Sequence, residues 1–168
     1  MTVDLSCISI TKPMENIDII NGWLAELGQE AGIEDLKLNE HHLCAFRYGK
    51  DLEFTIELPP QSPIVYLYSP MAELPSENKE AFFEKLLKAN FFCLETNGAT
   101  FSIDERSNRI ILSYGQPIDQ IDNLVFKNIV GNFLETAERW KDLLNTADIT
   151  ENQSASEGST NEDMGFKV

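Results

Sequence analysis

The chain has 168 residues, 42% of them hydrophobic, which suits a single domain with one core. Its 28 acidic and 13 basic residues give a formal net charge of −15. Because a field of this sign repels nucleic acid and anionic membranes, we expect no nucleic-acid partner and no membrane insertion, and we favour basic or neutral partners.

The cysteines and the ends of the chain point to the cytoplasm. Cys7, Cys44 and Cys93 are odd in number and lack Cys-x-x-Cys spacing, so we interpret them as free thiols in a reducing compartment. No basic segment followed by an apolar stretch indicates a signal peptide. The apolar runs are far shorter than the ~20 residues that span a bilayer.

Residues 1–12 alternate weakly between apolar and polar, which predicts a loose arm or an added edge strand. A helix is expected over 13–31, with Pro13 in its first turn and Gly32 as its C-cap. Its apolar positions form one stripe, namely Ile17, Ile20, Leu24, Leu27 and Ala31. Ile19 and Trp23 widen that stripe. The widened face is either core or partly open as a groove for a peptide.

Three strands are expected next, over 42–48, 52–58 and 64–68. The middle one alternates cleanly, with Phe54, Ile56 and Leu58 on one face, as in a half-buried strand. The prolines at 59, 60 and 63 force a turn. Residues 64–68 are apolar on both faces, so this strand is central or covered on both sides. The connections are short enough for an antiparallel meander.

A second helix is expected over 76–92, with Ser76 as its N-cap. Its apolar surface is broad for its length. If Phe83, Leu87 and Phe91 were exposed in a monomer, they would form an adhesive patch. A second copy of the chain is the simplest cover.

The rest of the predicted domain is two strands and a long helix. Gly98 opens a fourth strand, residues 110–114 form a fifth, and a polar hairpin turn joins them. The longest helix is expected over 120–145, where Gly131 could permit close packing. Residues 146–168 are acidic and poor in apolar residues, so we predict a disordered tail.

No catalytic or metal-binding pattern is present. His41 and His42 are adjacent, so in a strand they would point to opposite faces and could not share a metal easily. No cysteine has a paired histidine, and no serine lies in a Gly-x-Ser-x-Gly setting. Glycine-rich phosphate-binding motifs are also absent. We therefore expect neither an enzyme nor a cofactor. The alternative of a small enzyme would need two close carboxylates in a buried pocket.

The segment from Leu86 to Asp104 carries a family resemblance. It contains Leu-Leu-Lys-Ala-Asn at 86–90 and Thr-Asn-Gly-Ala-Thr-Phe-Ser-Ile-Asp at 96–104, followed at matching intervals by Trp140. With the order of predicted elements, these residues resemble the class I type III secretion chaperones, the CesT-like or Tir-chaperone family, over about residues 17–144. The resemblance implies an α+β fold of the order α-β-β-β-α-β-β-α, with helices packed on a twisted antiparallel sheet.

The resemblance also implies a function. Members of that family are acidic, non-enzymatic homodimers in the cytoplasm of Gram-negative bacteria. They serve virulence by binding the N-terminal region of a secreted effector and keeping it extended for export. The export gate or ATPase of the secretion apparatus is a candidate further partner. We expect residues 13–145 to form this domain. A same-fold regulatory or structural dimer that binds a folded partner is the alternative.

Two sets of residues are candidates for the binding surfaces. An effector segment could lay apolar side chains in grooves between the first helix and the meander, or add a strand at a sheet edge. The groove candidates are Trp23, Leu27, Phe46, Phe54, Ile56 and Tyr66. The candidates for the dimer interface are Phe83, Leu87, Asn90, Phe91, Ala99 and Phe101. For each groove candidate, ordinary core packing is the competing interpretation.

Overall fold

The computed structural model describes residues 13–145. The predicted N-terminal arm and the predicted tail lie outside the described residues and stay predictions. The elements and their bounds are α1 Pro13–Ala31, β1 Leu43–Tyr48, β2 Leu52–Glu57, β3 Ile64–Glu73, α2 Lys79–Ala89, the 3-10 turn η1 Phe91–Cys93, β4 Thr100–Asp104, β5 Arg109–Pro117, the 3-10 turn η2 Ile118–Gln120 and α3 Asn123–Asn145.

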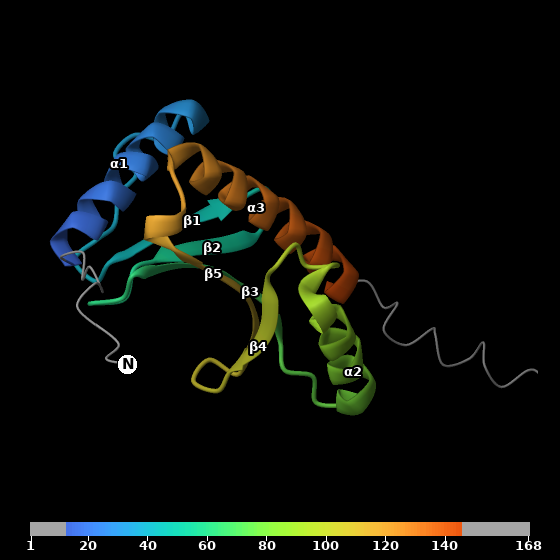
Figure 1. Ribbon diagram of the computed structural model, residues 1–168. Coiled ribbons are helices and arrows are strands. Elements are labelled where there is room, and N and C mark those ends of the chain that lie inside the picture. Colours follow the sequence, from blue (N-terminus) through green and yellow to red (C-terminus); the bar gives the residue numbers. More distant parts are fainter. Residues whose placement is uncertain (1–12, 146–168) are drawn as a thin grey trace, which may run out of the picture.

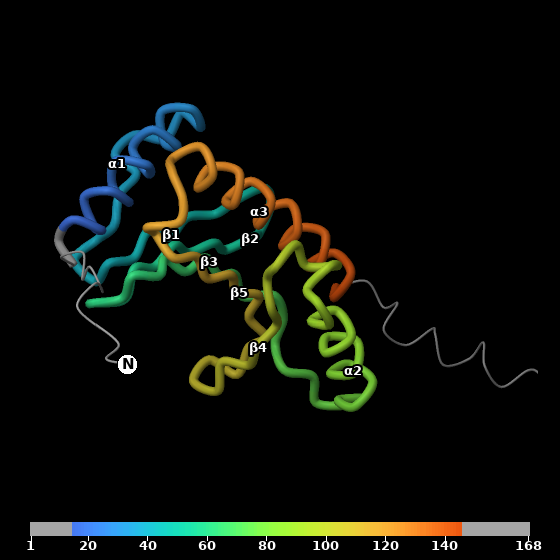
Figure 2. Tube along the Cα trace, in the orientation of Figure 1, coloured from blue at the N-terminus to red at the C-terminus, as the bar shows by residue number. Residues whose placement is uncertain are grey.

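The strands form one antiparallel sheet in the order β1-β2-β3-β5-β4. The long strands β3 and β5 pair near its centre, and the short β1 and β4 are its edges. Figure 1 shows α3 crossing one face of the sheet, with α1 near its N-terminal half and α2 near its C-terminal end. Figure 2 shows α1 beginning and α3 ending on opposite sides of the molecule. The predicted α+β fold and order of elements are confirmed.

The core lies between the sheet and α3. In β2, Phe54 and Ile56 are fully buried, whereas Glu53, Thr55 and Glu57, which alternate with them, are only half-buried, which is the predicted alternation. The ring of Phe54 lies 5.5 Å from that of Phe133 on α3. The prediction that β3 is central is confirmed, although it runs five residues further than predicted, to Glu73.

Helix α1 has the predicted bounds. Ile20 and Leu24 are fully buried on its inner side. The helix ends where Gly32 adopts a φ of +70°, which glycine reaches without steric cost. The N–H of Ile33 then donates to the carbonyl of Gly28 at 2.8 Å, so the predicted cap is confirmed.

Helix α3 begins three residues later than predicted. The carboxylate of Asp122 accepts a hydrogen bond from the N–H of Val125 at 2.9 Å and so caps the helix. Its buried stripe includes Phe126, Val130, Phe133, Ala137 and Trp140. The expectation that Gly131 permits close packing is wrong, because Gly131 is exposed and an added Cβ would meet no atom within 4 Å.

The second helix is shorter than predicted at both ends. Helix α2 begins at Lys79 and follows Asn78, which has a left-handed backbone, so Ser76 is not the N-cap. It ends at Ala89, and Phe92 and Cys93 have φ angles of 53° and 52°, which cannot continue a helix. The apolar period of the sequence runs through this break. No helix among residues 13–145 is long and apolar enough to cross a membrane.

Candidate partner-binding surfaces

Several exposed apolar side chains lie around the end of α2. Four large side chains there are mostly exposed: Leu87 by 69%, Phe91 by 70%, Phe92 by 76% and Leu94 by 79%. A hollow of about 420 Å³ continues this surface toward β4, and it is lined by Phe83, Leu86, Leu87, Asn90, Phe101, Ser102, Ile103 and Ile110. We call Leu87, Phe91, Phe92, Leu94 and Ile103 the α2–β4 patch. Monomeric proteins seldom expose apolar side chains so densely.

The predicted dimer-interface residues divide among this patch, the hollow beside it and the core. Leu87 and Phe91 belong to the patch, and Phe83 and Asn90 are half-buried in the lining of the hollow. Ala99 and Phe101 are buried within the chain, where the ring of Phe101 packs edge-on against Trp140 at 4.9 Å. These two therefore offer little surface to a partner.

The six predicted groove residues do not share one surface. Phe54 and Ile56 have no exposed surface, so they belong to the core. Phe46 is half-buried on β1 and packs against the ring of Phe54 at 4.9 Å. Trp23, 5.3 Å from the ring of Phe126, joins α1 to α3. The half-buried Leu27 also packs against the core.

Tyr66, the remaining groove candidate, lies on the opposite face of the sheet. It is 37% exposed and pairs with Gly115 on β5. Its ring lies over that glycine, because a Cβ on Gly115 would come within 3.0 Å of Tyr66 Cε1. The absence of a side chain at Gly115 thus leaves room for the ring of Tyr66 on this face.

Tyr68 lies two residues further along the same face. Burial raises the pKa of Tyr68 to about 12, and the charge and hydrogen bonding of Glu57 add to the rise. No helix among residues 13–145 crosses this face in Figure 1, and Tyr66 on it is exposed. The sequence predicted Tyr66 as a binding residue but did not predict this face of the sheet as one surface. The face is formed by residues of different strands, and only the pairing of the strands brings them together.

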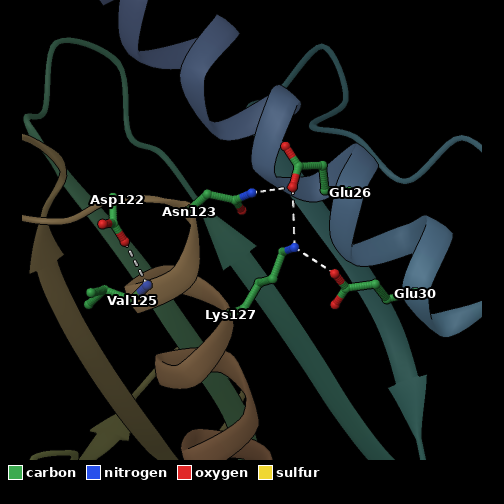
Figure 3. A network of polar contacts seen from close by, with 6 residues as sticks. All are labelled: Glu26, Glu30, Asp122, Asn123, Val125 and Lys127. Atoms are coloured by element: carbon green, nitrogen blue, oxygen red, sulfur yellow. Dashed lines mark hydrogen bonds and ion pairs between the residues drawn. The ribbon is translucent and has the colours of Figure 1, made fainter.

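A polar cluster fixes α1 to α3 (Figure 3). The Nζ of Lys127 lies 2.7 Å from a carboxylate oxygen of Glu30 and 3.2 Å from one of Glu26. The side-chain amide of Asn123 also donates to Glu26. The hydrogen bond to Glu30 is the main cause that raises the pKa of Lys127. Since Lys127 comes from α3 and both acids from α1, the cluster links the two helices at the surface, in addition to the contact of Trp23 with Phe126.

Comparison with known families decides the identity. The model of the Tir chaperone protein (CesT) family matches residues 22–141. The chain belongs to the Tir chaperone protein (CesT) family. This match spans most of the described elements, from α1 to near the end of α3. No curated protein sequence matches the chain significantly.

Solved structures share the fold of this CesT-family chain. A chain in the crystal structure of the ExsC–ExsE complex has a TM-score of 0.67 and 22% identity, over 78% of this chain and 97% of that one. A chain in the HopA1–SchA chaperone–effector complex has a TM-score of 0.62 and 14% identity, over 79% and 99%. A chain in the ExoU–SpcU complex of Pseudomonas aeruginosa has a TM-score of 0.57 and 17% identity, over 74% of this chain and 96% of that one. These likenesses show the fold.

The residues of the CesT-like resemblance hold α2, β4 and α3 together. Trp140 donates its indole N–H to the carbonyl of Glu95 at 3.1 Å. Asn97 donates to the hydroxyl of Thr136 at 2.8 Å. Gly98 has a φ of +88°, and a Cβ there would lie 2.9 Å from the ring of Tyr114. The most recognisable stretch of this CesT-family chain is therefore a scaffold.

The described part of the chain shows no grouping of ligands that could hold a metal ion. His42 Nδ1 lies 3.2 Å from the carbonyl oxygen of Leu58, and His41 lies 3.6 Å from the carboxylate of Glu40. Cys44 is buried, which raises the pKa of its thiol, and Cys93 is half-buried. The thiols of both residues are free, whereas Cys7 lies outside the described residues.

Proposed function

We propose that the chain is a non-catalytic, homodimeric chaperone in the cytoplasm of a Gram-negative bacterium. It binds the N-terminal region of one or more type III secretion effectors and keeps that region extended for export. The observation that carries the proposal is the family match over residues 22–141. The HopA1–SchA structure, which shares the fold, is a chaperone–effector complex.

The surfaces support recognition of an extended client. Binding through apolar side chains and sheet edges needs open edges and uncovered apolar area. Strand β1 is an open edge, whereas the other edge strand, β4, borders the α2–β4 patch. No helix among residues 13–145 crosses the face that carries Tyr66 and Tyr68. Residues 13–145 carry 22 acidic and 11 basic residues, which gives them a formal charge of −11. This charge favours clients with basic residues.

The α2–β4 patch supports a homodimer. In a twofold dimer, the patch of one subunit packs against the same patch of the other, so both patches are buried. Removing a large apolar side chain from water contributes roughly 1.5–3 kcal/mol. The patch would then be unavailable to the client, which would bind the open sheet face and the edge strand β1. The export gate or ATPase of the secretion apparatus is the candidate partner that binds the complex of chaperone and effector.

Co-purification from the native bacterium tests this function. A tagged full-length chain should retain a secreted protein, and mass spectrometry should map the bound segment to that protein's N-terminal region. Proteases should then cut the client outside the protected segment. A preparation that holds only a compact, fully folded partner, or no secreted protein at all, would contradict the proposal.

A matched pair of variants tests whether the client binds the sheet face that carries Tyr66. Tyr66→Arg places a charge on the open face, and Tyr48→Arg makes the same change at an exposed tyrosine on the opposite face of β1. Tyr66→Arg should reduce the recovered client at least about tenfold, the effect of roughly 1.4 kcal/mol. Equal recovery by the two variants would place the client elsewhere.

A further inference from the structure

One side of α1 borders an open hollow. Trp23 faces α3, and Ala25, Gly28 and Gly32 lie on the other side of the helix, where residues 33–37 fold back along them. Gly28 makes this fold possible, because a Cβ there would lie 2.7 Å from the carbonyl oxygen of Ile33. Small residues thus leave a hollow of about 590 Å³ between the helix and the loop.

The hollow combines an apolar wall with acidic groups. Ala25 and Ile33 line it, and Ile33 is 41% exposed. Glu34, Asp35 and Lys37 also line it, and all three are exposed. The Nζ of Lys37 lies 2.9 Å from each carboxylate oxygen of Asp35 and balances its charge, which leaves Glu34 as the carboxylate that can pair with a ligand. The C-terminus of α1 adds partial negative charge, and its last turn carries no basic residue. A ligand with an apolar stem and a positively charged end would match the apolar wall and the negative charge of the hollow.

The surrounding sequence strengthens the negative field. Residues 13–40 contain seven acidic residues and one basic residue, Lys37. The cluster at Lys127 offsets Glu26 and Glu30 on the side of α1 that faces α3, away from the hollow. The hollow also lies far from the α2–β4 patch, since α1 and α2 occupy opposite sides of the molecule (Figure 1). A dimer formed through that patch would leave the hollow open.

We propose that this hollow receives an arginine side chain from the client segment. The methylene stem would lie on Ala25 and Ile33, and the guanidinium would face Glu34. Arginine fits better than lysine, because its guanidinium is less strongly hydrated and presents five donors in one plane. This proposal rests on the proposed function for the client, but the chemistry of the hollow can be tested separately.

Two short peptides test the charge requirement. The probes are acetyl-Leu-Arg-Leu-amide and the same peptide with citrulline, which keeps the shape of arginine and lacks its charge. In an NMR titration of the full-length protein, the arginine peptide should shift the backbone amides of Gly28 and residues 33–37. The citrulline peptide should bind about three- to fivefold more weakly, as expected for loss of an exposed ion pair.

Matched variants locate the site. Glu34→Gln should weaken the arginine peptide about three- to fivefold, as expected for an exposed ion pair, and Ala25→Leu should reduce its shifts by narrowing the hollow. Glu77→Gln makes the same charge change in the exposed segment before α2 and should leave binding unchanged. Equal binding of both peptides, shifts elsewhere, or equal effects of the two glutamate variants would overturn the proposal.

The outcomes also separate this proposal from the proposed function. If a secreted N-terminal segment co-purifies but the arginine peptide does not shift residues 33–37, the chaperone function stands and the arginine site is rejected. If the arginine peptide binds as expected and no secreted protein co-purifies, the hollow is an arginine site and the chaperone function is rejected.

Discussion

The side chain of Asn90 is hydrogen-bonded to both backbone groups of Phe101. Its Nδ2 donates to the carbonyl of Phe101 at 3.1 Å, and its Oδ1 accepts from the N–H of Phe101 at 2.8 Å. Because β4 is an edge strand, part of its backbone has no neighbouring strand. The amide of Asn90 takes the place of such a neighbour and ties the end of α2 to the sheet.

Asn90→Ala should destabilise the fold by about 1–3 kcal/mol, because two hydrogen bonds are lost and the backbone groups of Phe101 keep no protein partner. Urea unfolding at one fixed protein concentration measures the change. Asn132→Ala, at an exposed position of α3, is the control and should be nearly neutral. If Asn90→Ala dissociated a dimer without loss of stability, Asn90 would instead act at the subunit interface.

Local periodicity was sufficient for much of the fold. The bounds of α1 and the alternation of β2 agree with prediction, because each depends on residues close in sequence. The end of α2 was missed because it depends on a distant contact, in which Asn90 binds Phe101. The left-handed backbone of Phe92 and Cys93 likewise leaves no sign in the apolar pattern.

The candidate surfaces were harder to predict, since alternation assigns a residue to a face without showing what covers it. Phe54 and Ile56 were placed correctly on one face of β2, but that face is filled by α3. Tyr66 pairs with Glu57 and therefore lies on the other face. Which residues of β2 and β3 share a face depends on the register between the two strands, and a single sequence does not reveal that register.

Trp140→Phe should lower the free energy of unfolding by about 1–2 kcal/mol. The indole N–H that donates to Glu95 is lost, while most of the packing against Phe101 is kept. Trp140→Ala should cost more, about 3–5 kcal/mol, because it leaves a cavity. Chemical unfolding followed by circular dichroism measures both. Equal losses for the two variants would mean that the hydrogen bond dominates and packing contributes little.

A double change in the α2–β4 patch tests the dimer. Leu87→Asp with Phe91→Asp should give a monomer in sedimentation, since both side chains are mostly exposed and the fold should persist. Central interface residues contribute about 2 kcal/mol or more each, so each change should raise the dissociation constant at least about 30-fold. Phe83 is avoided because it packs against Phe82.

Leu124→Asp is the control for that experiment, since Leu124 is equally exposed but lies in the first turn of α3. It should leave the dimer intact. A wild-type chain that sediments as a monomer, or a dimer that survives the double change, would reject the patch as the interface.

Tyr68 should make stability depend on pH in the alkaline range. With its pKa raised to about 12, Tyr68 keeps its proton in the folded chain after the unfolded chain has lost it near pH ~10. The unfolded state then binds fewer protons, so the stabilising contribution is complete below pH ~10 and is lost as the pH rises toward ~12. Tyr68→Phe removes this loss.

The stability of Tyr68→Phe relative to the wild type should therefore rise from about pH 9 to about pH 12, measured by urea unfolding at each pH. Because Tyr68 is only half-buried, solvent weakens the effect, and we expect about 1 kcal/mol instead of the ~2.7 kcal/mol of a full two-unit shift. Tyr48→Phe, at an exposed tyrosine, is the control. The same pH dependence in both variants would show that Glu57 and burial do not hold the proton on Tyr68.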